Sequence, residues 1–108
     1  MTVVDITTTG RKSAQPRRIE IVMHNIGGKL YISGQPFPRR RSWLSNLERN
    51  PKFTLHLKRG ARADLPATAR EITDLKERRQ VLEEVARHWK RDDVDTMVEQ
   101  SPLIEVTV

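Results

Sequence analysis

Hydrophobic and polar residues alternate along several short stretches of the chain, a pattern typical of strands that bury one face. The clearest example is 52–58, in which Phe53, Leu55 and Leu57 share a face. The segment 65–72 alternates less regularly, and Pro66 places its start at a sheet edge or a bulge. In all, the pattern predicts six strands, at 3–9, 18–24, 29–33, 52–58, 65–72 and 103–108.

Apolar residues spaced three or four apart predict three helices. Ser42 is placed to cap the first, which runs from 43 to about 50 and ends before Pro51. Asp74 is placed to cap the second, which continues to about 90, with Glu77 reaching back toward the cap. The third is short, from about 92 to 100. The second helix carries a stripe that we expect to be buried: Leu75, Leu82, Val85, Ala86 and Trp89.

These elements follow one another in the order β-β-β-α-β-β-α-α-β, and short connections join neighbouring strands. The segment 25–28 closes a hairpin, whereas 10–16 and 34–38 contain proline and read as exposed loops. The order predicts an α+β or small-barrel fold, mostly antiparallel, with about six strands, one short helix and C-terminal helices. A chain of 108 residues allows a single domain, 1–108.

The composition narrows the classes of protein that remain. Cysteine is absent, which excludes disulfides, thiolate metal sites and cysteine nucleophiles and suits a reducing cytoplasm. The apolar runs are only a few residues long and the first residues lack a basic-then-apolar leader, so we expect a cytoplasmic protein without a membrane span. The core is modest, so a bound cofactor or a subunit partner would add stability.

Charge is distributed unevenly along the chain. Residues 1–62 carry 13 lysines and arginines against 3 acidic residues, whereas residues 63–108 carry 7 against 11. This imbalance predicts that the first half faces an anion, either a nucleic acid or a phosphorylated ligand, with plain solubilising charge as the alternative. Aromatic residues are few there, which makes nucleic acid the less favoured partner. The basic clusters are Arg11-Lys12, Arg17-Arg18 and Arg39-Arg40-Arg41.

The loop that follows the first strand combines hydroxyls, backbone amides and two adjacent cations, which suits an anion cradle. Its spacing does not match a nucleotide-binding P-loop, because the earlier glycine is missing and no helix follows. The three histidines share no ligand-like spacing, so we expect structural or surface histidines and no metal site. No Ser-His-acid or paired-carboxylate pattern stands out, so no catalytic residue is assigned. The histidines are His24, His56 and His88.

Three motifs occur in order along the chain, and together they resemble the deazaflavin-dependent nitroreductase family over nearly its whole length. The resemblance implies a split β-barrel of the pyridoxamine-phosphate-oxidase-like superfamily that binds the deazaflavin coenzyme F420. It also implies hydride transfer from reduced F420 to a quinone, a nitroaromatic or another small electrophilic substrate. The motifs are Thr7-Thr8-Thr9-Gly10-Arg11-Lys12-Ser13, then Pro16-Arg17, then Trp43-x-x-Asn46-Leu47-x-x-Asn50-Pro51.

The same resemblance implies which residues bind the cofactor. Four from the first two motifs would contact its phosphate and acidic tail: Arg11, Lys12, Ser13 and Arg17. Four others would line its remaining parts: Ser33, Gly34, Trp43 and Asn46. Arg41, with Arg39 and Arg40, would either add contacts to the tail or lie in solvent. Taken by themselves, Trp43 suits core packing and Asn46 suits a local structural hydrogen bond.

Several alternatives stay open on the sequence. FMN could replace F420, as it does in relatives of the fold, and the protein could carry its cofactor without turnover. A basic nucleic-acid-binding module is the alternative from another class. A homodimer is expected from the small core and from the habit of the family. The chain has Ala14 and Leu44 where the family commonly has glycine and tyrosine, so the class of substrate does not carry over.

Overall fold

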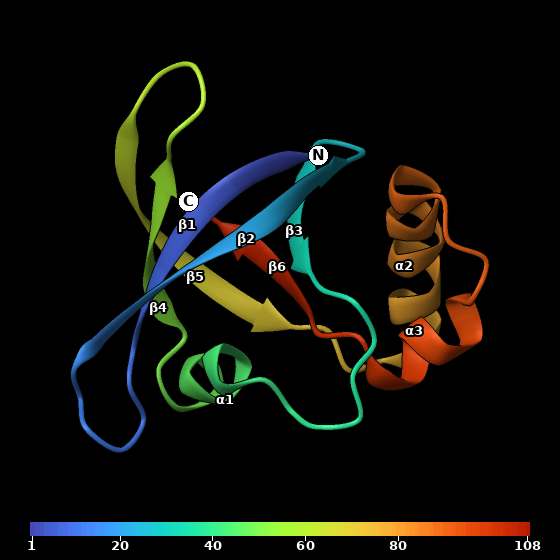
Figure 1. Ribbon diagram of the computed structural model, residues 1–108, viewed down its shortest axis with the longest axis horizontal. Coiled ribbons are helices and arrows are strands. Elements are labelled where there is room, and N and C mark those ends of the chain that lie inside the picture. Colours follow the sequence, from blue (N-terminus) through green and yellow to red (C-terminus); the bar gives the residue numbers. More distant parts are fainter.

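Six antiparallel strands close into a barrel in the order β1-β2-β3-β6-β5-β4 (Figure 1). The computed structural model describes residues 1–108. Every neighbouring pair is antiparallel, which confirms the α+β class and the mostly antiparallel barrel predicted from the alternation. The strands are β1 (Thr2–Thr9), β2 (Pro16–Ile26), β3 (Lys29–Ser33), β4 (Lys52–Leu57), β5 (Ala63–Glu71) and β6 (Leu103–Thr107).

Three helices accompany the barrel, at the places that the sequence predicts. They are α1 (Ser42–Arg49), α2 (Leu75–Trp89) and α3 (Val94–Gln100). Helix α1 lies across one end of the barrel, whereas α2 and α3 lie together on the side of β3 and β6 (Figure 1). None of the three has both the length and the apolar composition needed to cross a membrane.

The predicted helix caps are only partly right. Asp74 caps α2, because its carboxylate accepts a hydrogen bond of 2.9 Å from the backbone N–H of Glu77. Glu77 does not reach back to the cap, since its carboxylate pairs with Arg70 at 2.6 Å. Ser42 is not the cap of α1: the helix begins at Ser42 itself, and Arg41 takes the cap position with an extended backbone and no side-chain cap bond.

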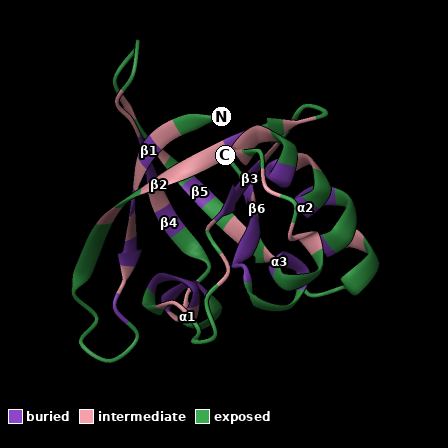
Figure 2. Ribbon diagram, turned by 45° about the vertical axis from the view of Figure 1, so that its right-hand side comes forward, coloured by how far each residue is buried: buried purple, intermediate pink, exposed green.

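The inward residues of the strands form the first of two cores, inside the barrel. Phe53 and Leu55 are buried as predicted, and Leu57 packs partly buried against them. Helix α1 closes one end of this core with Trp43, and Figure 2 shows the buried inner side of that helix. The buried cluster consists of Val4, Ile6, Ile32, Trp43, Leu44, Leu47, Phe53, Leu55, Ala67, Ile104 and Val106.

The second core lies between α2, α3 and the outer side of the barrel. The predicted stripe of α2 is right for three of its residues but wrong for Leu75, which is 69% exposed. Arg78 takes the buried position on that face instead, four residues before Leu82. Trp89 is half-buried and packs at the margin. The buried cluster consists of Tyr31, Ile72, Val81, Leu82, Val85, Ala86, Met97, Val98 and Leu103.

Two strands leave part of an edge without a neighbour. Residues 22–26 of β2 pair with β3, whereas 16–21 pair with β1 alone. On β5, Pro66 lies in the part that pairs with β4 but not with β6, which confirms its predicted edge position. The open edge of β2 lies where the loop after β3 leaves the barrel, so this opening is a natural place for a ligand.

A pair of histidines joins the barrel to α2. His24 on β2 is fully buried, and its Nδ1 lies 2.8 Å from the Nδ1 of His88. The two rings stack with centroids 5.1 Å apart, and Trp89 meets the ring of His24 edge-on. Burial, followed by the neighbouring His88 and the N-terminal ammonium, lowers the pKa of His24 to about 4. His24 therefore stays neutral in the folded protein at neutral pH.

This depressed pKa predicts loss of stability on acidification. Below about pH 6.5 His24 takes up a proton in the unfolded chain but not in the folded chain. The free energy of unfolding therefore falls as the pH is lowered to about 4. We expect this residue to remove about 2 kcal/mol of unfolding free energy between pH 7 and pH 5. Urea unfolding at both pH values measures it, with His24→Gln as the non-titrating variant. An equal pH dependence in that variant would contradict the prediction.

Candidate cofactor site

A cavity of about 1320 Å³ opens between the β1–β2 loop, the open edge of β2, the loop 34–41 and α1. All nine predicted cofactor residues line it, although they come from five separate parts of the chain. The structure therefore brings the whole predicted set to one place. These residues are Arg11, Lys12, Ser13, Arg17, Ser33, Gly34, Arg41, Trp43 and Asn46.

The loop between β1 and β2 is held in shape by its own hydrogen bonds. The N–H of Gly10 donates to the carbonyl of Gln15, and the N–H of Ala14 donates to the carbonyl of Gly10, both at 2.8 Å. A Cβ on Gly10 would lie 2.8 Å from Ser13 Oγ and 3.1 Å from the carbonyl oxygen of Gln15, so a larger residue would crowd this turn. Ala14 has φ 58, in the left-handed region that favours glycine. Residues 11–13 form the tip of this closed loop.

Asn46 fastens the loop to α1. Its Oδ1 accepts hydrogen bonds from the backbone N–H of Arg11 at 3.1 Å and from Arg11 Nη1 at 3.0 Å. Its Nδ2 donates to Thr8 Oγ1 at 3.2 Å, and the residue is only 4% exposed. Asn46 thus borders the cavity, but its side-chain oxygen and nitrogen already form hydrogen bonds within the protein. These contacts confirm the structural hydrogen-bonding role that Asn46 suggests when the residue is taken by itself.

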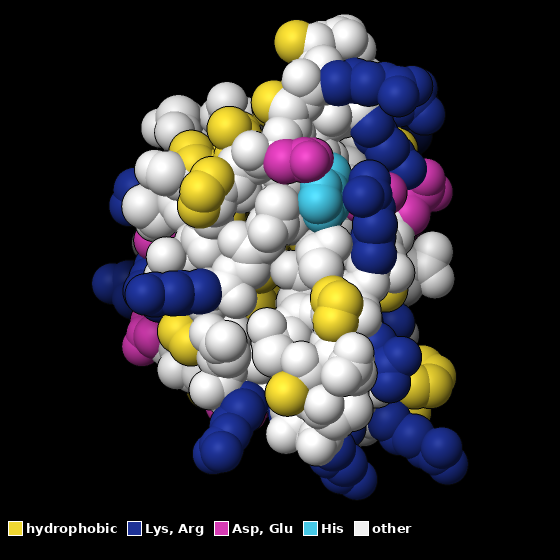
Figure 3. All heavy atoms as spheres, turned by 90° about the vertical axis from the view of Figure 1, so that its left-hand side faces the viewer, with side chains coloured by type: hydrophobic (Ala, Val, Ile, Leu, Met, Phe, Trp, Pro, Cys, Tyr) yellow, Lys and Arg dark blue, Asp and Glu magenta, His cyan; other side chains and the backbone are white.

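The charges around the cavity are strongly unbalanced. Its only acidic side chain, Glu20, pairs with Lys58. Arg40 pairs with Glu48 and Glu71, so it is tied to neighbouring carboxylates. Figure 3 shows basic side chains projecting at the lower end of the molecule, where Figure 1 places the β1–β2 loop. Five cations of the lining have no ion pair with a carboxylate: Arg11, Lys12, Arg17, Arg39 and Arg41.

Arg41 is held in place beside Gly34. Its Nη2 donates to the carbonyl of Gln35 at 2.6 Å, and its guanidinium carbon lies 5.7 Å from the centre of the Phe37 ring. A Cβ on Gly34 would come within 3.2 Å of Arg41 Nε, so glycine permits this approach. The Nε of Arg41 is buried and has no hydrogen-bond partner in the protein. An acceptor oxygen of a bound anion would supply it.

Ser33 and Trp43 mainly serve the fold. The hydroxyl of Ser33 donates to the carbonyl of Pro102 at 2.7 Å and is buried, which joins β3 to the turn before β6. Trp43 is 8% exposed and belongs to the core of the barrel, so only a margin of its ring borders the cavity. Core packing of Trp43 is therefore confirmed, whereas its contact with the cofactor stays a prediction.

Several residues that line the cavity were not predicted from the sequence. Trp89, which we expected in the core alone, reaches the cavity from the end of α2, and Arg91 follows it. Phe37, 48% exposed, lines the cavity from the loop 34–41. Ile19 and Ile21 belong to the wall because their part of β2 lacks a second neighbour. No sequence pattern marks Trp89, Arg91 or Phe37 as lining residues, since only the docking of α2 and the path of the loop 34–41 bring them here.

The fold and the cavity define a split-barrel protein with a site for an anionic cofactor. The family model described as F420H(2)-dependent quinone reductase matches residues 1–108. The chain belongs to this family, and it is a deazaflavin-dependent oxidoreductase whose cofactor is coenzyme F420. The resemblance drawn from the three motifs is thereby confirmed.

Solved structures show the same fold at low sequence identity. An F420-H2-dependent reductase is 23% identical with a TM-score of 0.72, over 97% of this chain and 93% of its own. A protein described as a domain-swapped dimer is 23% identical with a TM-score of 0.71, over 97% and 79%. An FAD-binding protein from Mesorhizobium loti is 13% identical with a TM-score of 0.61, over 100% and 81%.

Proposed function

We propose that the cavity holds coenzyme F420 and that the chain passes its hydride to a quinone. The observation that carries this proposal is the gathering of the nine predicted residues, with five unpaired cations, around one cavity. Reduced F420 supplies the hydride, and the protein supplies position and electrostatics. The phosphate and acidic tail of the cofactor match a lining that holds several cations and one neutralised carboxylate.

The basic side chains of the lining would contact the cofactor from different positions around the cavity. Lys12 and Arg17, exposed at the end of the β1–β2 hairpin, are free to close on phosphate or carboxylate oxygens. Arg11 is oriented by Asn46 and keeps part of its guanidinium for the cofactor. Arg41, next to Ser42 whose carbonyl Arg11 contacts, adds an Nε without a protein partner. Because arginine presents a planar fork of donors, Arg11, Arg17 and Arg41 suit the two-oxygen groups of the tail.

The lining offers neither a histidine nor an unpaired carboxylate as a general acid or base for the transfer. It contains no histidine, and the carboxylate of Glu20 is engaged by Lys58. The contribution of the chain is therefore orientation of the two reactants and exclusion of water. Apolar side chains on the wall suit a flat, apolar acceptor such as a quinone ring: Ile19, Ile21, Phe37, Trp43 and Trp89.

Two substitutions of Asn46 distinguish its anchoring of the β1–β2 loop from the effect of local charge on cofactor binding. Asn46→Ala removes the acceptor of two Arg11 donors, and we expect it to lower the unfolding free energy by about 2 kcal/mol. Asn46→Asp keeps that acceptor but adds a negative charge to the anion site. We expect Asn46→Asp to stay close to the wild type in stability and to bind F420 about tenfold more weakly. Urea unfolding and F420 titration measure the two effects, and equal stability of both variants would contradict the anchoring role.

Anaerobic mixing of the protein with reduced F420 and menadione tests the proposed reaction. We expect oxidation of F420 that depends on both the protein and the quinone, with a nitroaromatic as a second acceptor. Binding of F420 without oxidation by any acceptor would indicate a carrier. A purified protein with flavin absorbance, released as FMN, would instead favour the flavin alternative.

One further proposal concerns a second copy of the chain, and one test concerns nucleic acid, the less favoured partner. A homodimer is supported by the small core and by the solved relative described as a domain-swapped dimer. Light scattering with mass determination tests it, and a monomer at micromolar concentration would contradict it. Binding to nucleic acid would require steep salt dependence, which a DNA titration at two salt concentrations measures.

A further inference from the structure

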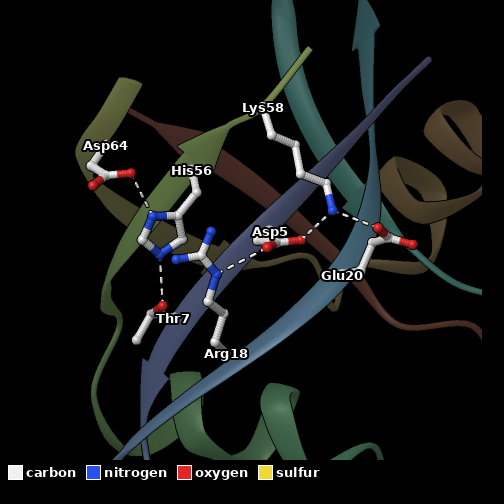
Figure 4. Close-up of polar contacts among 7 residues, drawn as sticks. All are labelled: Asp5, Thr7, Arg18, Glu20, His56, Lys58 and Asp64. Atoms are coloured by element: carbon white, nitrogen blue, oxygen red, sulfur yellow. Dashed lines mark hydrogen bonds and ion pairs between the residues drawn. The ribbon is translucent and has the colours of Figure 1, made fainter. Parts of the chain in front are cut away.

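The outer face of the barrel carries a chain of hydrogen bonds that the proposed function does not use. Thr7 on β1, His56 on β4 and Asp64 on β5 lie next to one another on three neighbouring strands (Figure 4). Nε2 of His56 lies 2.7 Å from Thr7 Oγ1, and Nδ1 lies 2.7 Å from Asp64 Oδ1. None of the three lines the cofactor cavity. They form a separate group of polar side chains, here named the outer relay.

The carboxylate of Asp64 determines which atom donates in each hydrogen bond of the outer relay. An ionised carboxylate only accepts hydrogen bonds, so Nδ1 of His56 carries the proton toward Asp64. Nε2 of the neutral ring then holds a lone pair, and the hydroxyl of Thr7 donates to it. A hydroxyl that donates to an imidazole oriented by a carboxylate is the arrangement that activates a nucleophile. The outer relay therefore has the order nucleophile, base and orienting group.

The barrel fixes the three side chains in place. His56 pairs directly with Asp64 across β4 and β5, and Thr7 pairs with Thr54 across β1 and β4. His56 is only 8% exposed, so its ring is packed into the surface, whereas the side chain of Asp64 is 75% exposed. Figure 3 shows a histidine side chain at this face beside acidic and basic side chains. A base that is held on a strand is better positioned than one on a mobile loop.

Arg18 supplies positive charge beside the hydroxyl. It pairs with Thr7 across β1 and β2, and its Nε donates to Asp5 at 2.9 Å, which leaves its two terminal nitrogens without a protein partner. Figure 4 shows the guanidinium beside the ring of His56. Strand β1 is paired on both sides here, so its backbone amides cannot stabilise an oxyanion. Stabilisation rests on Arg18, and a slow reaction with small reagents is expected.

We propose that Thr7 is an activated hydroxyl that accepts an acyl group from a small activated ester or thioester. The Oγ of Thr7 bonds to the acyl carbon while His56 Nε2 takes the hydroxyl proton. The bond from the acyl carbon to the leaving oxygen or sulfur then breaks, and His56 returns the proton to that atom. The products are the Thr7 ester and the free alcohol or thiol, with no change of oxidation state. Hydrolysis by water restores the hydroxyl.

p-Nitrophenyl acetate tests the proposal with the intact protein. We expect release of p-nitrophenolate together with one acetyl group that peptide mapping by mass spectrometry places on Thr7. His56→Gln is expected to slow acetylation of Thr7 about 100-fold or more, because it removes the base. Thr7→Ser keeps the hydroxyl and should keep the acetylation.

Thr54 provides the matched control. It faces the same side as Thr7 on the neighbouring strand, and its hydroxyl makes no hydrogen bond to His56. Thr54→Val should leave acetylation of residue 7 unchanged, whereas Thr7→Val should abolish the acetyl group at that position. Circular dichroism confirms that each variant is folded. Acetylation confined to lysines, or acetylation of Thr7 at the same rate in His56→Gln, would overturn the proposal.

Discussion

Replacing Lys12 and Arg17 together by glutamine is expected to weaken F420 binding by about 100-fold or more. Both line the cavity and neither has an ion pair, so the substitutions remove contacts to the cofactor and leave the fold intact. A charge-assisted hydrogen bond contributes about 1.5–3 kcal/mol, and two of them account for that loss of affinity. Titration followed by the fluorescence of the deazaflavin ring measures the affinity at fixed ionic strength.

The matched control removes two other exposed cations. Lys52 and Arg62 have no ion pair and lie outside the cavity, so their replacement by glutamine lowers the net charge by the same amount. We expect this pair to change the affinity by less than about threefold, because distant surface charges are screened by salt. Equal losses for the two double variants would show that net charge alone attracts the cofactor, and would contradict a built site.

Removal of Arg78 is expected to have the largest effect on stability. Its guanidinium is buried and carries no acidic partner, and burial lowers its pKa below the ordinary value. It donates instead to four carbonyls, at Ile72, Met97, Val98 and Ser101, with the bond to Ser101 at 2.6 Å. Arg78→Ala removes all four of these bonds, although the carbonyl of Met97 keeps the N–H of Ser101 as a donor, and we expect a loss of about 4 kcal/mol in the free energy of unfolding by urea.

Two other variants provide the comparison for Arg78→Ala. Arg78→Lys keeps the charge but has fewer donors in a different geometry, so we expect a smaller loss of about 2 kcal/mol and a folded protein. Arg79, the next residue, forms an exposed ion pair with Asp95, and Arg79→Ala should cost less than about 1 kcal/mol. A similar small cost for Arg78→Ala would mean that water replaces the guanidinium, and would contradict its role as the link between α2 and α3.

The fold could be predicted from the sequence because local patterns determine most of it. Alternation of apolar residues located the strands, and the Asp74 cap located the start of α2. A small barrel was predicted, but the strand pairs that close it, β1 with β4 and β3 with β6, were not, because these strands lie far apart along the chain. Leu75 was misplaced for a related reason: Arg78 satisfies carbonyls of α3, and no helical periodicity reveals such acceptors.

All nine residues predicted to bind the cofactor line one cavity, but part of its apolar wall was missed, and their contact with the cofactor stays a prediction. The basic loop and the motifs that accompany it identified residues that the structure gathers around one cavity. Trp89 and Phe37 were missed because their position depends on docking of α2 and on the path of the loop after β3. The outer relay was missed because Thr7, His56 and Asp64 have no characteristic spacing, and only the register of three strands brings them together.

The most direct test of a cofactor site built from cations compares F420 with the same deazaflavin ring and ribityl chain lacking the phosphate and acidic tail. Fluorescence titration of the protein with each compound, at low and at high salt, measures the contribution of the anionic groups. We predict micromolar or tighter binding of F420 that weakens with salt, and binding of the truncated compound that is at least about 100-fold weaker. Equal affinity for the two compounds, or no binding of F420 at micromolar concentration, would contradict the account.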